Sequence, residues 1–133
     1  MKKITLLLVI IFTFLFSTTS WGEWSYVTEN LRGTKFYYDK DRVRKNGKYL
    51  YLWMLDDYLK PTKYGDLSST SYILLDCSIF RFKDLKGIFY KKSMGEGEIS
   101  DEWTPKGEYG EWDYPKPNSV YETVLNKICE EHQ

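Results

Sequence analysis

Two cysteines, Cys77 and Cys129, stand 52 positions apart and constrain this fold more than any other feature of the sequence. In an exported chain, two cysteines most simply form one disulfide bond. By the chain-entropy relation, a loop of that length contributes roughly 4 kcal/mol to stability. The alternatives are a redox or metal-binding pair, which would show closer spacing or nearby histidine, and a bond to a second chain. We expect an intramolecular bridge that ties the C-terminal segment to the middle of the chain.

The N-terminus has the pattern of a secretory signal peptide. A basic start precedes a 13-residue apolar run at positions 4–16, and small residues follow at Ser20 and Gly22. These positions predict cleavage after Gly22, with a cut before Trp21 as the rival and an uncleaved anchor as the alternative. Neither cysteine closely follows the apolar run, so a bacterial lipoprotein anchor is not expected. We expect residues 1–22 to be removed from a bacterial protein exported to the periplasm, the cell surface or the medium.

The composition is that of one globular domain, which we assign to residues 23–133. Hydrophobic residues make up 42% of the 133 positions, too many for a disordered chain. The 19 basic and 19 acidic residues cancel, which argues against a nucleic-acid binder because such proteins usually carry a basic excess. His132 is the single histidine and stands at a terminus, where fraying is expected. We therefore expect no catalytic or metal site, and no second membrane-spanning segment.

Six segments have the aromatic and β-branched composition of strands. The strongest hairpin signal is Asn46-Gly47, because both residues tolerate positive φ. Pro61 and Gly65 mark a loop, and the stretch 96–117 is expected to be an irregular connection. The expected strands are residues 24–28, 34–38, 42–45, 48–57, 71–82 and 85–92.

The C-terminal segment changes to a helical period. Ser119 and Glu122 form a capping box at its start. One helical face then carries Tyr121, Val124, Leu125, Ile128 and Cys129. Cys77 alternates with Ile73, Leu75 and Ile79 along one face of an expected strand. The sequence thus predicts an α+β fold: an antiparallel sheet of about five or six strands, with one C-terminal helix packed on a face and tied by the Cys77–Cys129 disulfide.

The second face of the expected sheet is also apolar. The segment 49–55 is apolar at every position, and the side opposite Cys77 carries Tyr72, Leu74, Phe80 and Phe82. One short helix cannot cover both faces of a sheet. Either the sheet curls around a core, or the second face meets a partner, a ligand or a second copy in a homodimer.

Charges are segregated along the chain. Residues 32–48 contain seven basic and two acidic groups, whereas residues 96–117 contain seven acidic and two basic groups. The acidic stretch also carries aromatic side chains, and mixed polar and aromatic surfaces suit protein recognition. Two solvated surfaces that attract one another within the fold are the alternative. The candidate protein-binding residues are Arg42, Arg44, Lys45, Lys48, Trp103, Tyr109 and Trp112.

An ordered set of short motifs resembles the bacterial surface-adhesin E family across nearly all of residues 23–133. The motifs are Phe36-Tyr37-Tyr38-Asp39, Arg42, Lys45-Asn46-Gly47, Trp53-Met54-Leu55-Asp56-Asp57-Tyr58, Ser68-Ser69, Asp76-Cys77, Arg81, Met94-Gly95-Glu96-Gly97, Trp112, Pro117-Asn118-Ser119 and Cys129. The resemblance implies a mostly antiparallel sheet with a C-terminal helix held by the Cys77–Cys129 bridge. It also implies a surface adhesin for host matrix and serum proteins such as vitronectin and laminin, with dimerisation and haem binding associated. The sequence departs from the family pattern in lacking a lipidation cysteine, and this absence argues against surface display.

Two hypotheses follow. The first is a non-enzymatic, adhesin-like module that binds a protein partner through the basic or the acidic aromatic region. Combined Arg42→Glu and Lys45→Glu changes should then abolish binding to an acidic partner. The second is a carrier of a small ligand such as haem, held between aromatic faces of a dimer, with Tyr or Met as the iron ligand because His132 is poorly placed. We expect no resident cofactor under the first hypothesis.

Overall fold

The computed structural model describes residues 23–106 and 110–132. The signal peptide expected at residues 1–22 lies outside the described residues, and so does Tyr109. Within the described ranges the chain forms seven strands, two short 3-10 helices and one α-helix. The elements are β1 (Trp24–Glu29), β2 (Lys35–Asp39), η1 (Lys40–Arg42), β3 (Arg44–Asn46), β4 (Tyr49–Asp57), β5 (Ser68–Asp76), β6 (Arg81–Tyr90), η2 (Ser93–Gly95), β7 (Ile99–Trp103) and α2 (Val120–His132).

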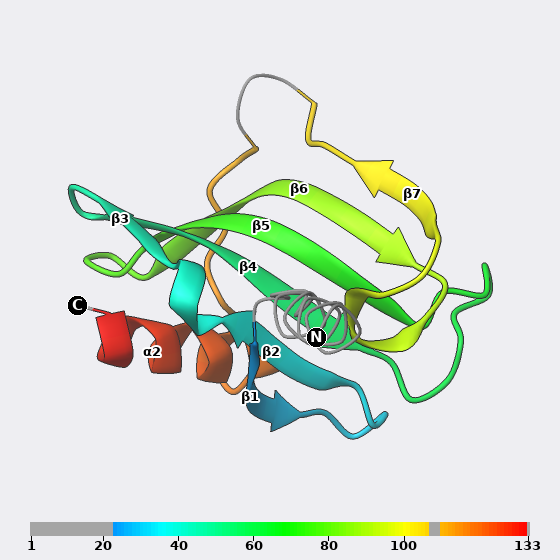
Figure 1. The fold of residues 1–133 in the computed structure, drawn as a ribbon. Helices are drawn as coiled ribbons and strands as arrows, with labels where there is room; N and C mark the ends of the chain where they lie inside the picture. Colours follow the sequence, from blue (N-terminus) through cyan, green and yellow to red (C-terminus); the bar gives the residue numbers. More distant parts are fainter. Residues whose placement is uncertain (1–22, 107–109, 133) are drawn as a thin grey trace, which may run out of the picture.

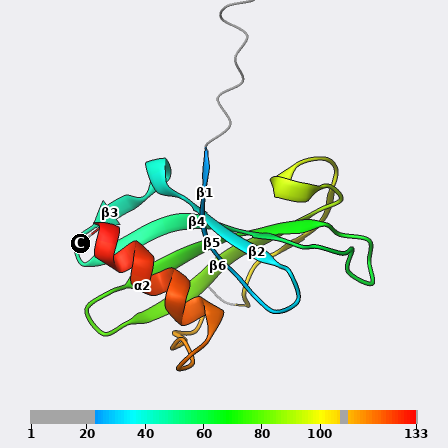
Figure 2. The ribbon, with the colours of Figure 1, turned by 90° about the horizontal axis from the view of Figure 1, so that it is seen from below.

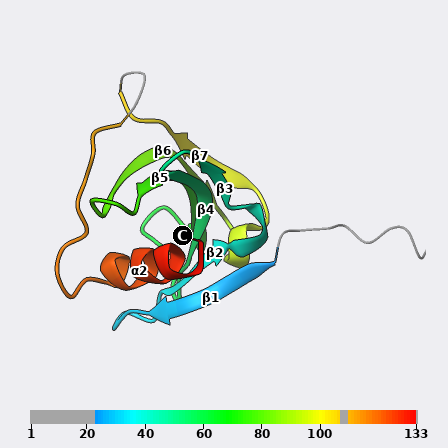
Figure 3. The same cartoon turned by 90° about the vertical axis from the view of Figure 1, so that its left-hand side faces the viewer.

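The strands form one antiparallel sheet in the order β1-β2-β4-β5-β6-β7, and β3 also pairs with β4 (Figure 1). The sheet curls, and α2 lies inside the curve (Figure 3). Seen from below, α2 runs across the sheet with its last turn near β3 (Figure 2). We call the face that α2 covers the inner face and the opposite one the outer face. The predicted α+β architecture is confirmed, with seven strands where five or six were expected.

The core lies between α2 and the middle of the inner face. Alternate residues of β4 and β5 point inward because side chains of a strand alternate between faces. Leu52 and Ile73 are directly paired in the register and are fully buried. Val124 and Ile128 of α2 are also fully buried within the same cluster. The predicted helical stripe is therefore the face that closes the core.

The start of α2 and its covalent tie both agree with the sequence. The Ser119 hydroxyl accepts a hydrogen bond from the Glu122 amide at 3.1 Å, which is an N-cap. The Glu122 carboxylate reaches the amide of Asn118, one residue before the position that a standard capping box uses. Cys77 and Cys129 form a disulfide with their Cα atoms 5.8 Å apart. The predicted bridge is confirmed.

The single strand expected over residues 71–82 is wrong, because the chain reverses inside it. β5 ends at Asp76 and β6 begins after a turn at residues 77–80. The Asp76 carboxylate accepts a hydrogen bond from the Ser78 amide at 3.1 Å, the local bond by which aspartate nucleates turns. Phe80 takes a positive φ of 52° to complete the reversal. β6 therefore begins at residue 81 and not at 85.

This turn changes which side chains share a face. Ile79 lies in the turn and is 52% exposed, so it does not continue the buried face of β5. Phe82 pairs with Leu75 and is 6% exposed on the inner face. Its expected place beside Tyr72 on the second face is therefore also wrong. The alternation in the sequence continues through the turn, so it carried no sign of the break.

Two further boundaries differ from the prediction. The hairpin at Asn46-Gly47 is confirmed, but Asn46 pairs with Tyr49, so Gly47 and Lys48 form the connection and only Gly47 has positive φ. The stretch 96–117 is not wholly irregular, because β7 forms within it and pairs with β6. β5 pairs along one edge of β6, and β7 satisfies hydrogen-bonding groups along the other edge from Gly87 to Tyr90.

Candidate functional site

A row of aromatic side chains lies along the outer face of the sheet. Tyr49, Tyr51 and Trp53 alternate along β4 with core residues, and Tyr72 of β5 stands directly opposite Trp53. The ring centroids are 5.0 Å apart for Trp53 and Tyr72, 6.3 Å for Tyr51 and Tyr72, and 5.8 Å for Tyr49 and Trp112. All five side chains are half-buried. We call these five residues the aromatic row. Its rings are partly exposed to solvent.

Cationic groups lie against the tyrosines of the row. The guanidinium carbon of Arg44 is 5.3 Å from the ring centroid of Tyr51. The ammonium of Lys48 is likewise 5.3 Å from the centroid of Tyr49. Both distances lie within the range where a cation is attracted to the face of a ring. Arg44 and Lys48 are exposed, so their charges remain available to solvent.

Trp112 meets two more cations at the end of the row. The Arg81 guanidinium carbon and the Lys83 ammonium lie 4.0 and 4.6 Å from its ring centroid. Its neighbour Asp113 exchanges two backbone hydrogen bonds with Phe82, of 2.9 and 2.8 Å, which fixes the connecting segment beside β6. Together the four cations, Arg44, Lys48, Arg81 and Lys83, form what we call the cationic rim.

One buried carboxylate holds two members of the cationic rim in place. Asp76 is fully buried, with its Oδ2 3.2 Å from the Nε of Arg81 and 3.9 Å from the Nζ of Lys48. Burial by itself would raise the pKa of this carboxyl, but the hydrogen bonds from Ser78 and Arg81 and the charge of Lys48 together hold it below its ordinary value. Asp76 therefore stays ionised and orients two members of the cationic rim.

The structure brings together only some of the predicted binding residues. Arg44, Lys48 and Trp112 meet on the outer face, as the preceding contacts show. Arg42 instead lies 3.5 Å from the carboxylate of Asp39 at the end of β2. Lys45 pairs with the core residue Leu50 and so projects from the opposite side of β3 to Arg44. The basic segment is thus divided between two faces.

The acidic segment is divided in the same way. Trp103 pairs with Gly87, and its indole lies over that residue on the inner side, 3.5 Å from where a Cβ would stand. Trp112 lies on the outer face. Tyr109 is outside the described residues. The expected single aromatic acidic loop therefore supplies tryptophans to both faces of the sheet.

Sequence reasoning placed Tyr72 and the segment 49–55 on an apolar second face, but it did not name their rings as binding residues. The segment 49–55 is apolar at every position, so hydropathy could not separate its two faces. The signal was the residue type: Tyr49, Tyr51 and Trp53 alternate with Leu50 and the aliphatic core residues after it. An aromatic ring with a polar edge suits a half-exposed position, whereas the aliphatic residues suit full burial.

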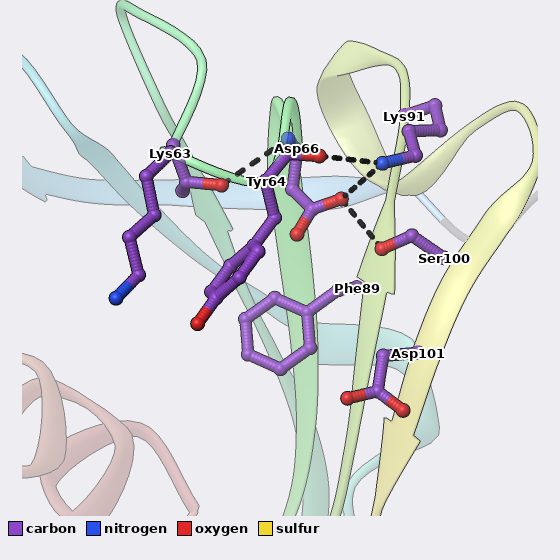
Figure 4. Close-up of a pocket in the computed structure, with 8 residues that line it drawn as sticks. Lys63, Tyr64, Asp66, Phe89, Lys91, Ser100 and Asp101 are labelled. Atoms are coloured by element: carbon purple, nitrogen blue, oxygen red, sulfur yellow. Dashed lines mark hydrogen bonds and ion pairs between the residues drawn. The ribbon is translucent and has the colours of Figure 1, made fainter.

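The inner face carries a pocket of about 670 Å³ beyond the start of α2 (Figure 4). Tyr64 and Phe89 contribute rings, and Asp101 contributes a carboxylate. Lys91 fixes one wall because its ammonium donates to the Tyr64 carbonyl at 2.7 Å and to the Asp66 carboxylate at 3.2 Å. Thr62, Lys63 and Ser100 complete the lining.

Several carboxyl groups near this pocket on the inner face are desolvated by burial. Burial, followed by the charge of Asp84, raises the pKa of Asp56 to about 7. Burial and then Asp113 raise the pKa of Asp84. Burial and the same carboxylates raise the pKa of the Tyr121 hydroxyl. The inner face is therefore acidic and desolvated here, in contrast to the cationic outer face.

His132 is not frayed, contrary to the expectation from its position. Its Nε2 lies 3.2 Å from the hydroxyl oxygen of Tyr38, and the two rings meet edge-on at 5.8 Å. The Tyr38 hydroxyl donates a hydrogen bond to Glu131. Burial, followed by that bond, raises the pKa of Tyr38. The last turn of α2 is packed, so the expectation that His132 is frayed and therefore poorly placed as a ligand is wrong. Haem binding and dimerisation both stay predictions.

No group of three His, Cys, Asp or Glu side chains in the described part of the chain is arranged to hold a metal ion. Among the helices of residues 23–106 and 110–132, none is long and apolar enough to cross a membrane.

The comparisons with known proteins place the chain in a family. Residues 24–130 match the family described as surface-adhesin protein E, and the chain belongs to that family. Its fold is similar to that of Haemophilus influenzae protein E in crystal form II, with a TM-score of 0.62 at 15% identity over 86% of this chain and 93% of that one. Protein E from non-typeable H. influenzae gives 0.58 at 15% over 85% and 79%. No curated protein sequence matches this chain.

Proposed function

We propose that this protein is an exported, non-enzymatic binding module that acts at the cell surface and holds an acidic protein against the aromatic row and the cationic rim. One observation carries this proposal: four cations lie against half-buried rings on a single face of the sheet. Rings offer large contact area with few rotatable bonds, and tyrosine, tryptophan and arginine are the residues enriched at binding hot spots. Membership in the surface-adhesin family supports adhesion as the class of function.

The cationic rim supplies selectivity for acidic partners. Opposite charges across an interface accelerate encounter and exclude partners of the same sign. Asp76 pre-orients two members of the rim, Arg81 and Lys48, so less side-chain entropy is lost at these two positions when a partner binds. Host matrix proteins, which the family resemblance implies, are the partners to test first.

The test compares two pairs of charge reversals that are matched in charge. Arg44→Glu with Lys83→Glu changes the outer face, whereas Arg42→Glu with Lys45→Glu changes residues outside the row. Binding is measured by surface plasmon resonance on immobilised vitronectin and laminin. We expect the first pair to weaken binding at least tenfold and the second pair to leave it within about twofold. Equal losses from both pairs would reject the outer face as the contact surface, and no binding by the parent protein would reject these matrix proteins as its partners.

A further inference from the structure

β7 is the outermost strand of the sheet, and its free edge is open. The strand order ends at β7, so one side pairs with β6 and the other side faces no strand of the described chain. All five of its residues are exposed. Natural sheets usually protect such edges with charged side chains, lysine above all, with proline, or with very short strands. β7 contains neither lysine nor proline, and Ile99 and Trp103 are 47% and 48% exposed.

Two hollows lie along the inner side of this edge. The pocket in Figure 4 reaches Phe89 and Asp101, and a second hollow of about 430 Å³ shares both residues. The second hollow extends to Trp103, Asp84 and other residues of the inner face. An added strand would send alternate side chains into these hollows, because strand side chains alternate between faces. An open edge beside side-chain hollows is the arrangement used in strand-addition recognition.

The charge of the edge selects among occupants. β7 carries Asp101 and Glu102, and Asp84 lines the adjoining hollow. Lys86 is the cation paired with this strand, 3.8 Å from Glu102. Two β7 strands paired edge to edge would bring like charges together, which is destabilising. A basic segment would instead meet carboxylates on β7 and in the second hollow, whose described lining holds Asp84 and Asp101 but no lysine, whereas Lys63 and Lys91 line the pocket in Figure 4.

We propose that the free edge of β7 binds an extended, basic peptide segment of a partner protein by strand addition. Main-chain hydrogen bonds supply affinity, and a lysine or arginine of the segment enters the hollow beside Asp101. The side chain two positions along the segment packs on Trp103, where the aliphatic stem of a second lysine can lie. This second site is separate from the aromatic row, and the variants that test the two surfaces do not overlap.

The experiment uses the full chain and three blocked peptides of about eight residues, a usual strand length. The first alternates lysine with threonine, the second alternates glutamate with threonine, and the third keeps the lysines of the first but replaces threonines with proline. Proline removes the backbone donor that strand pairing needs. Calorimetry gives affinity, and amide hydrogen exchange reports protection of residues 99–103.

We expect the lysine–threonine peptide to bind, to slow exchange along β7, and to bind at least tenfold more tightly than the other two peptides. Asp101→Asn with Glu102→Gln should weaken it at least tenfold. The charge-matched control, Glu96→Gln with Glu98→Gln, removes two carboxylates outside the strand and should change affinity less than about twofold.

Three outcomes overturn the proposal. Equal binding of the proline peptide would show attraction by charge alone, and absent binding would show that the edge is unused. Protection of β7 in the peptide-free protein, together with a doubled mass in solution, would assign the edge to a second copy of this chain.

Discussion

The guanidinium carbon of Arg81 lies 4.0 Å from the ring centroid of Trp112, although the two residues are far apart in the sequence. This contact joins the start of β6 to the segment that leads into α2. Arg81 also reaches the buried carboxylate of Asp76 at 3.2 Å. One side chain thereby links the support of the cationic rim to the end of the aromatic row.

Trp112→Ala should weaken binding of an acidic partner without unfolding the protein. The ring is half-buried on the outer face, so its loss removes contact surface for the partner and exposes Tyr49. We expect a loss of about tenfold or more in affinity, as for a hot-spot tryptophan, measured by surface plasmon resonance. The control is Trp103→Ala, which removes an equal ring from the inner side. If Trp103→Ala is as damaging, the outer face has no special part in binding.

Arg81→Met should destabilise the fold, because it leaves the Asp76 carboxylate buried with fewer partners. Removing one member of a buried ion pair costs about 3–5 kcal/mol, and the bonds from Ser78 and Lys48 should reduce this to about 2–3 kcal/mol. The pKa of Asp76 is lowered in the folded state, so the stabilisation is present above its unfolded value and is lost as pH falls through the folded one. Urea unfolding at pH 7 measures the cost. The exposed Arg32→Met is the control, and equal effects of the two changes would contradict this account.

Replacing both cysteines by serine should lower the free energy of unfolding by about 4 kcal/mol, because the bridge closes a loop with a sequence separation of 52. Loss of the bridge frees α2 from the turn after β5, so the end of the helix should also exchange its amides faster. Denaturant unfolding of the oxidised parent and the double variant gives the difference. A change below about 1 kcal/mol would mean that packing of α2 alone holds the two segments together.

Asp56→Asn should stabilise the protein at alkaline pH. The folded-state pKa of Asp56 is raised from 3.8 to about 7, so its contribution is fully present below pH 3.8 and is lost as pH rises through 7. Asparagine stays neutral, so the variant should gain about 3–4 kcal/mol at pH 8 relative to the parent and little at pH 4. Thermal unfolding across this range checks the slope. The control is Asp41→Asn at an exposed position, which should leave the pH dependence of stability unchanged. If the stability of the parent protein did not fall between pH 4 and pH 8, Asp56 would be solvated.

The elements that could be predicted were those encoded by neighbouring residues. The cap at Ser119 and the stripe through Ile128 depend on spacing within one helix, and both are present. The reversal at residues 77–80 was missed because the alternation of apolar residues in the sequence continues through it. Asp76, whose carboxylate forms the turn, looks in the sequence like any aspartate at the end of a strand. β7 was missed because an exposed edge strand shows little hydrophobic pattern and forms against a neighbour.

The sequence alone determined the composition of the core, the helix that covers it and the cysteines that tie them, since each depends on periodicity or on a unique pair of residues. It also supplied the family motifs. The tertiary structure decided which charged and aromatic residues share a surface. Arg44 and Lys45 are neighbours in the chain but lie on opposite sides of a strand, whereas Arg44 and Trp112 serve the same face. Strand register sets those positions, because side chains alternate and a shift of one residue exchanges the two faces.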